Sequence, residues 1–289
     1  MSHHLNITPR SELDFKLDDQ DLPRHWFGGD AFKTRYFDAM SLSFPDGERF
    51  FMMAVRAYKH TITDPALLED IKDFNRQEGQ HGVIHTQFNE VLRRQGIDID
   101  KVLRVQNFIQ FNIYWKYFPK AYNLAATAAL EHLTATMVYS LFDHGPVMQD
   151  ADPRVRAMYA WHAIEELEHK SVAFDVMQQG ARVGYIVRCL AMVQCTLHFS
   201  LQTFLVVNFL LKADGFGFWQ RAKMMAKGMA WLYGPKGVFT ALAGHFVSYF
   251  KPGFHPNKVD LSPSYERWSA VFARQGDPIA ASNALYAVA

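Results

Sequence analysis

The chain has 289 residues, of which 49% are hydrophobic and 15% aromatic, and its formal net charge is +1. This composition suits one main domain with a large apolar core and an added segment, and the balanced charge excludes a basic surface of the kind that binds nucleic acid. The two cysteines, Cys189 and Cys195, lie in one apolar run. That placement fits neither a disulfide scaffold nor a zinc site, so we expect them to be packing residues.

The first residues, "MSHHLNITPRSELDFKLDD", are polar and charged where a signal peptide would carry an apolar stretch, so we expect a cytoplasmic protein. Residues 1–44 are predicted to form an extended arm. The first helix is expected in "FPDGERFFMMAVRAYKH", entered through Pro45, Asp46 and Gly47, because apolar residues recur at helical spacing after Glu48.

The second predicted helix has a signal at each end. Asp64 is a suitable N-cap, Pro65 is tolerated at the first helical position, and Gly96 is a suitable stop. The short link to the first helix makes the two helices antiparallel neighbours. Residues 97–120 then form a mixed segment that is long enough to cross a helical bundle from end to end.

A second pair of helices repeats this plan. One is expected from Ala121 to about Phe142, and the next from Asp152, as the cap, and Pro153 to about Gly180. Pair, crossover and pair is the connectivity of a four-helix bundle with one long connection. We therefore predict an all-α fold with a metal-binding bundle over residues 45–182 and a helical C-terminal extension over residues 183–289.

Each predicted bundle helix carries side chains that bind metal ions. The first and third helices each supply one glutamate, and the second and fourth each supply Glu-x-x-His, whose two ends share one helix face. Each Glu-x-x-His can therefore hold one ion and share it with a carboxylate of a neighbouring helix. His162 lies on the same face as Glu166, as a ligand or, alternatively, as an outer partner that holds a carboxylate. The predicted metal ligands are Glu48, Glu78, His81, Glu131, His162, Glu166 and His169.

The charge of these ligands predicts two metal ions. Four glutamates in an apolar core would repel one another and raise each other's pKa values, which costs free energy unless cations are present. Two divalent ions would neutralise the four carboxylates, and neutral imidazoles would complete the coordination. Carboxylates with imidazole suit iron or manganese, and the pattern contains no thiolate ligand. We therefore expect two iron ions, with manganese as the alternative in one or both positions.

Four neighbouring residues are left out of this ligand set. In "WHAIEELEHK", residues 161–170, helical geometry turns Glu165 and Glu168 to the flank, so we expect them to be bystanders. His85 lies on the same face of the second helix as its ligands, and His255 lies in the turn-rich stretch "KPGFHP". The sequence leaves the roles of these two histidines open.

The repeated Glu and Glu-x-x-His pattern resembles that of the ferritin-like di-iron carboxylate proteins over residues 45–180. This resemblance implies a ferritin-like four-helix bundle that holds a di-iron centre. The additional His162, in His-x-x-x-Glu-x-x-His, is similar to the site of the di-iron arylamine N-oxygenases. The phrases "FPDGERFF" and "KPGFHP" also resemble a bacterial family described as predicted metal-dependent hydrolases, along most of the chain, which implies a metal-dependent reaction.

The C-terminal extension contains an apolar run over residues 189–211 that has no formal charge and is long enough to span a bilayer. Gln194, His198 and Gln202 recur in it every four residues and form a polar stripe, which favours a helix packed against the bundle over a transmembrane span. Residues 216–236 mix aromatic and basic side chains in the manner of a membrane-surface helix. Peripheral membrane contact and a homodimer are therefore left open.

The expected reaction is oxidation by dioxygen, in an oxidase or oxygenase that acts on an apolar or amine-containing small molecule. The metals would supply the reactivity, while the protein supplies ligand geometry and an apolar cavity. The alternatives are a binuclear metal-dependent hydrolase, in which the metals lower the pKa of water, and a non-catalytic iron-binding protein. The expected partners are a small-molecule substrate, dioxygen and an electron donor, and they do not include nucleic acid.

Overall fold

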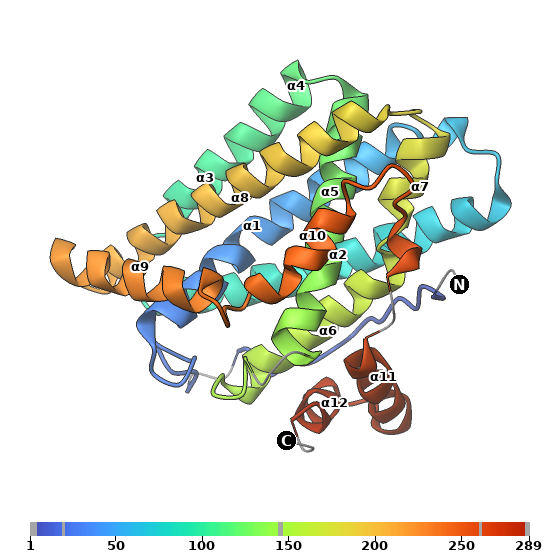
Figure 1. Cartoon of the computed structure of the whole chain (residues 1–289). Helices are drawn as coiled ribbons and strands as arrows, with labels where there is room; N and C mark the ends of the chain where they lie inside the picture. Colours follow the sequence, from blue (N-terminus) through green and yellow to red (C-terminus); the bar gives the residue numbers. More distant parts are fainter. Residues whose placement is uncertain (1–4, 19–20, 144–146, 260–261, 287–289) are drawn as a thin grey trace.

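A computed structural model describes residues 5–18, 21–143, 147–259 and 262–286. This part of the chain consists of helices and their connections, and its only β pairing is a single bridge between Phe27 and Ala151. The predicted all-α fold is therefore confirmed (Figure 1). The α-helices are α1 (Ala31–Arg56), α2 (Pro65–Arg94), α3 (Asp100–Asn107), α4 (Trp115–Tyr117), α5 (Lys120–Val138), α6 (Pro153–His169), α7 (Val172–Gln179), α8 (Tyr185–Ala213), α9 (Phe218–Tyr233), α10 (Ala243–Ser248), α11 (Pro263–Gln275) and α12 (Pro278–Ala284).

The predicted start of the first helix at Pro45 is wrong, and so is the part of the predicted extended arm over residues 31–44, whereas the described residues between 5 and 30 contain no helix. Helix α1 begins at Ala31, where the Asp30 carboxylate caps it by accepting from the backbone N–H of Lys33. Nearly every residue in the first half of α1 is buried. Because burial on all sides leaves no apolar stripe, the sequence of this half lacks the periodicity that marks a surface helix.

Pro45 lies inside α1 and removes one helical hydrogen bond, because proline has no backbone N–H. The backbone C=O of Ser41 is the group that loses its donor. The side-chain amide of Asn89, on α2, donates to this carbonyl instead over 3.2 Å. The helix continues through the proline because the neighbouring helix supplies the missing donor.

The paired helices and the crossover agree well with the prediction. Asp64 and Asp152 cap α2 and α6 through their carboxylates, and Gly96 follows α2 with a positive φ of 79°. Residues 100–117 form the crossover as α3, a π-helical turn and α4. The predicted fourth helix to Gly180 is wrong in one respect, because the chain breaks after α6 and resumes as α7. Short non-α turns lie at Lys59–Thr61, Phe108–Tyr114, Tyr139–Asp143, Thr240–Leu242 and Pro256–Lys258.

Four helices, α1, α2, α5 and α6, surround a core that is divided into two apolar halves. On α2, Phe74 belongs to one half and Ile84 to the other, and on α5 the same holds for Ala129 and Ala135. The predicted ligands of these helices lie between the two halves. The polar residues therefore form one layer across the middle of the bundle, enclosed by apolar packing on both sides.

The C-terminal helices cover this bundle. Helix α8 packs along α1 and α5, and α11 and α12 pack on α6, as Figure 1 shows. Helix α9 approaches α1 at Gly228, where a Cβ atom would lie 2.1 Å from the ring of Phe32. Within the described residues, α8 is the one helix that is long and apolar enough to cross a membrane, judged by length and composition alone. This weak indication is compatible with a soluble protein as well as with a membrane-associated one.

Candidate metal centre

All of the predicted ligands meet in the polar layer of the bundle, and all are buried. Helix α1 supplies one of them, α2 two, α5 one and α6 three. Gly82 permits the close approach of α1 and α2, because a Cβ atom there would lie 3.3 Å from Glu48 Oε2. The residues brought together are Glu48, Glu78, His81, Glu131, His162, Glu166 and His169.

These side chains form two overlapping sets of donors. In the first set, Glu78, Glu131, Glu166 and His169 bring one ligand atom each to within 4.8 Å of one another. His169 Nε2 lies 3.0 Å from Glu78 Oε1, 3.3 Å from Glu131 Oε2 and 3.5 Å from Glu166 Oε1. The carboxylates of Glu78 and Glu166 also belong to donor groups on the other side, with His81. Glu78 and Glu166 therefore belong to candidate metal-binding groups on both sides of the cluster.

The second set lies toward α1. His81 Nδ1 is 3.8 Å from Glu78 Oε1 and 3.6 Å from Glu166 Oε1. His162 Nε2 is 3.2 Å from Glu166 Oε1, and its Nδ1 is 3.9 Å from Glu48 Oε1. The second set therefore combines the imidazole nitrogens of His81 and His162 with carboxylate oxygens of three glutamates.

The residues fit metal ions because their inner atoms lack hydrogen-bond donors. Within the described part of the chain, both carboxylate oxygens of Glu48, Glu78 and Glu131 are buried with no donor in hydrogen-bonding geometry. The same holds for His81 Nδ1 and His169 Nε2. Buried acceptors that face one another without donors are costly, and cations at their centre would satisfy them together.

The outer nitrogens of two histidines contact groups that fix which ring nitrogen faces the cluster. His81 Nε2 lies 3.2 Å from a carboxylate oxygen of Glu165, to which it donates. His169 Nδ1 lies 2.8 Å from Gln77 Oε1, and Gln77 Nε2 in turn donates to Glu168 over 2.8 Å. His81 therefore directs an unprotonated Nδ1 inward, which is the arrangement found in metal-ligating histidines, and His169 directs its Nε2 inward, which must lose its proton before it can bind metal.

The tautomer of His162 is set by a longer chain of hydrogen bonds. The Asn89 amide group donates to the Ser41 carbonyl, so its oxygen accepts from the Ser41 hydroxyl at 2.9 Å. The same hydroxyl oxygen accepts from His85 Nδ1 at 2.8 Å. His85 Nε2 is then left to accept from His162 Nδ1, also at 2.8 Å. His162 thus directs a bare Nε2 toward Glu166, and His85 acts as its outer partner.

The prediction that Glu165 and Glu168 are bystanders is wrong, because both are buried and paired with Arg10. Arg10 donates to Glu165 over 2.9 Å and to Glu168 over 2.7 Å. Its guanidinium also lies 5.2 Å from the centre of the Trp268 ring on α11. The N-terminal segment and α11 therefore hold the two carboxylates that orient His81 and Gln77.

Burial and mutual repulsion set the pKa values of the cluster. Burial, then the charges of neighbouring glutamates, hold the pKa values of Glu48 and Glu78 well above their usual range, and raise that of Glu131 to about 7. Burial alone would lower the pKa of His169, but the charge of Glu166 outweighs it and holds the pKa well above its usual value. Burial lowers the pKa of His81, which keeps this ring in the neutral form that binds metal.

Metal affinity is therefore expected to rise with pH through about 7. A carboxylate binds metal only after losing its proton, and Glu131 loses it near pH 7. Below that pH the affinity should fall by about tenfold per pH unit for each proton displaced. Competition with a chelator at about pH 6 and about pH 8 measures this change, and equal affinity at both would contradict the assignment of Glu131.

The stability of the metal-free protein should change in the opposite direction. The pKa of Glu131 is 4.5 when unperturbed and about 7 in the fold, so the folded state binds more protons than the unfolded state between these values. The contribution of Glu131 to the free energy of unfolding therefore falls as pH rises from about 4.5 to about 7. Urea unfolding of the metal-free protein across this range measures the effect.

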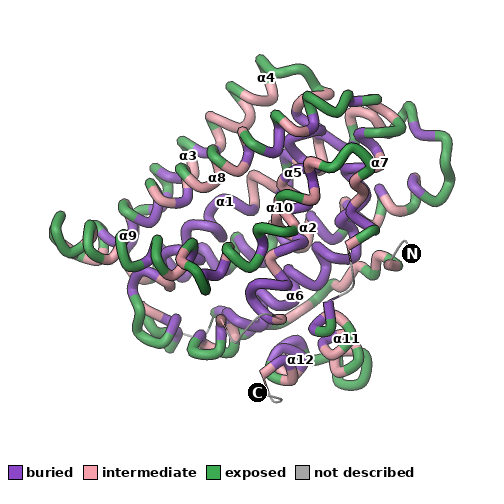
Figure 2. The backbone as a smooth tube through the Cα atoms, viewed as in Figure 1, coloured by how far each residue is buried: buried purple, intermediate pink, exposed green. Residues whose placement is uncertain are grey.

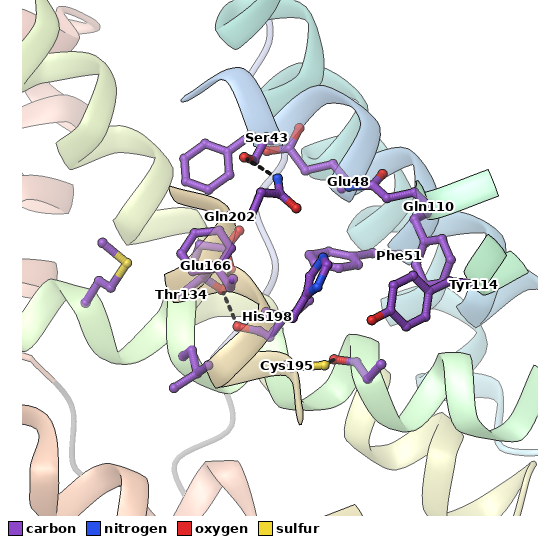
Figure 3. A pocket seen from close by; sticks show the side chains of 18 of the residues that line it. Ser43, Glu48, Phe51, Gln110, Tyr114, Thr134, Glu166, Cys195, His198 and Gln202 are labelled. Carbon is purple, nitrogen blue, oxygen red and sulfur yellow. Dashed lines mark hydrogen bonds between the residues drawn. The ribbon is translucent and has the colours of Figure 1, made fainter. Parts of the chain in front are cut away.

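A cavity of about 120 Å³ adjoins the second set of donors, between α1, α5, α6 and α8. Glu48 and Glu166 border it, and Thr134 donates a hydrogen bond to Glu166 (Figure 3). The predicted polar stripe of α8 faces this interior, and Gln202 donates to Ser43 over 3.1 Å. The interpretation of this segment as a helix packed on the bundle is thereby confirmed.

His255, whose role the sequence left open, lies outside the cluster. Its Nε2 is 2.9 Å from Asp175 on α7, and its Nδ1 accepts from the backbone N–H of Asn257. It belongs to none of the candidate metal-binding groups in the described residues. His255 therefore fixes the turn after α10 against α7.

The fold and the site define an all-α protein with a buried cluster of glutamates and histidines that could hold metal ions. The chain belongs to the family described as predicted metal-dependent hydrolase, whose model it matches over residues 9–260. Neither the curated proteins nor the solved structures contain a match to it. The family description supports a metal-dependent hydrolase, which was the alternative, more directly than it supports an oxidase or oxygenase. It leaves the identity of the metal open.

Proposed function

We propose that this protein is an enzyme with two metal ions, held by the seven predicted ligands and acting on a small apolar molecule in the adjoining cavity. The observation that carries this proposal is a set of buried carboxylate and imidazole atoms that have no hydrogen-bond donor. These atoms lie at the border of that cavity. Glu78 and Glu166 would help to hold both ions, because each belongs to candidate groups on both sides of the cluster.

Oxidation by dioxygen is the reaction that the lining of the cavity favours. Among the described residues that line it, the charged groups are Glu48 and Glu166, and more than half of the others are apolar. Apolar side chains such as Phe44, Leu130 and Met137 border the space beside the ligands, where they suit an apolar substrate. Carboxylates with three imidazoles suit two iron ions. When bound and reduced, these ions would supply the electrons that reduce dioxygen.

Hydrolysis is the second candidate, and the family description favours it. In that case the ions would lower the pKa of a water molecule and polarise the bond to be cleaved. The outer partners would have the same task in both reactions: Glu165 and Gln77 hold the ligating histidines, and Thr134 orients Glu166.

Metal analysis followed by exposure to dioxygen separates these reactions. We expect about two iron ions per chain after growth with iron, and a transient visible absorption band when the reduced protein is mixed with dioxygen. Two zinc ions, no response to dioxygen and turnover of ester substrates would establish hydrolysis instead. Iron bound far beyond two per chain would indicate an iron-binding protein, and the absence of bound metal after reconstitution would refute the proposal.

A further inference from the structure

An open groove lies beside the inner cavity, on the surface between α8 and the junction of α4 and α5. The groove has a volume of about 860 Å³ and is lined by apolar side chains, among them Phe118, Val193 and Leu197. Leu197 is 67% exposed, so the groove is unfilled in the monomer. Figure 2 shows exposed residues along the outer face of α8.

The groove and the inner cavity share two residues of α8, Gln194 and His198. Gln194 donates to the Tyr114 hydroxyl over 2.5 Å and accepts from the Tyr122 hydroxyl at 3.2 Å. His198 packs edge-on against Tyr114, with ring centres 5.5 Å apart. These polar side chains stand between two apolar spaces, and movement of the Gln194 amide would join them.

The two volumes limit the shape of a molecule that uses both. The inner cavity, at about 120 Å³, is close to the size of one that holds a single benzene ring. A bulky substrate therefore cannot lie wholly beside the ligands, whereas a narrow chain can place its end there and leave the rest in the groove. No charged side chain lines the groove within the described residues, so the part bound there must be uncharged.

We propose that the groove and cavity together bind one unbranched alkyl chain, whose inner end lies beside Glu48 and Glu166. This inference rests on the proposed function for the role of that inner end. It identifies the substrate class as a linear hydrocarbon or the alkyl part of a small amphiphile. Gln194 is then a positioning residue that closes the passage when no chain is bound.

Binding of straight-chain alcohols tests the proposal without any need for turnover. Hexanol, octanol and decanol would displace cis-parinaric acid, a fluorescent unbranched fatty acid, from the purified protein. We expect the affinity to increase by about fourfold for each added methylene group, until the chain fills the groove. Equal affinity for all three alcohols, or no displacement, would overturn the proposal.

Variants on α8 locate the chain. Leu197→Gln should weaken decanol binding by about tenfold, because Leu197 lines the groove. Leu205→Gln is the matched control, since Leu205 is 62% exposed on the same helix and lines neither space. In the inner cavity, Leu133→Phe should shift the plateau in affinity to a shorter alcohol without changing the increase per methylene.

Three further outcomes distinguish this inference from its alternatives. Equal losses in Leu197→Gln and Leu205→Gln, together with sedimentation on phosphatidylcholine vesicles, would mean that the whole face of α8 lies on a bilayer, and would overturn the single-chain site. Alcohol binding by a protein that never holds metal would refute the proposed function while leaving the alkyl site in place. Two bound metal ions without alcohol binding would refute the alkyl site while leaving the proposed function in place.

Discussion

Replacing Glu78 with glutamine is expected to lower metal affinity by at least about 100-fold, more than the loss of a typical outer partner costs. The same change should stabilise the metal-free protein. Glu78 belongs to donor groups on both sides of the centre, so both ions lose a ligand. Without metal, burial and the negative charge of Glu131 disfavour the ionised form of Glu78 and raise its pKa well above the usual range. Glutamine keeps the shape and removes the charge.

The opposite signs of these two effects identify a ligand. A residue with only a packing role would destabilise the protein with and without metal. Bound metal is measured by elemental analysis, and stability by urea unfolding before and after reconstitution. Glu69→Gln is the matched control on the same helix, because the Glu69 side chain is 61% exposed and pairs with Lys72 on the surface. Both measurements should be unchanged in this control.

Glu131→Gln is expected to weaken the binding of only one of the two ions. Glu131 belongs to a candidate group with His169 and to none with His81. The variant should therefore retain one ion and bind the other weakly. Retention of two ions with unchanged affinity in both Glu78→Gln and Glu131→Gln would contradict the ligand assignment.

The inner side chains of the site could be predicted from the sequence because they follow helical geometry. Positions three apart on one helix share a face, and the caps at Asp64 and Asp152 fixed where two of the helices begin. The structure brings all seven predicted residues together. Their role as metal ligands stays a prediction that the substitutions above test.

The start of α1 could not be predicted because two local signals were misleading. Pro45 resembles a helix start, but Asn89 of another helix replaces the hydrogen bond that the proline removes. The preceding turns are buried on all sides, and their polar residues are paired over long range. Arg35, for example, contacts Asp38 and also Asp214, which lies at the end of α8. Such pairing is invisible in a sequence pattern.

The outer layer of the site was missed for a related reason. Glu165 and Glu168 occupy positions that would face solvent on an isolated helix. All residues of α6 from Val155 to His169 are nevertheless buried, because the N-terminal segment, α11 and α12 cover its outer face. The available signal was the number of glutamates on a helix that otherwise lacks a polar face, since buried carboxylates need a cation.

Arg10 is that cation, and it connects both ends of the chain to the centre of the bundle. On one side it pairs with Glu165 and Glu168, which contact His81 and Gln77. On the other side its guanidinium lies over Trp268, which is fully buried. The N-terminal segment and α11 thus act on the predicted ligands through two carboxylates, although neither contributes a predicted ligand.

Replacing Arg10 with methionine is accordingly expected to destabilise the protein by about 3–5 kcal/mol, because two buried carboxylates lose their partner. Metal affinity should also fall, by about 10–100-fold, since Arg10 no longer fixes the carboxylates of Glu165 and Glu168, which hold His81 and Gln77 in place. Burial already raises the pKa of Glu165 despite the opposing charge of Arg10. Without Arg10 that pKa rises further, so the variant should lose more stability as pH increases above about 4.5.

The control is Arg93→Met, which removes surface pairs with Glu90 and Asp100 and should cost only about 0–1 kcal/mol. Adding Glu165→Gln and Glu168→Gln to Arg10→Met should recover much of the stability, because the unpaired charges are then gone. Metal affinity should stay low in this triple variant, since a neutral amide orients His81 less firmly than a carboxylate does. A single Arg10→Met change that leaves stability and metal affinity at the level of Arg93→Met would show that the buried network does not support the centre.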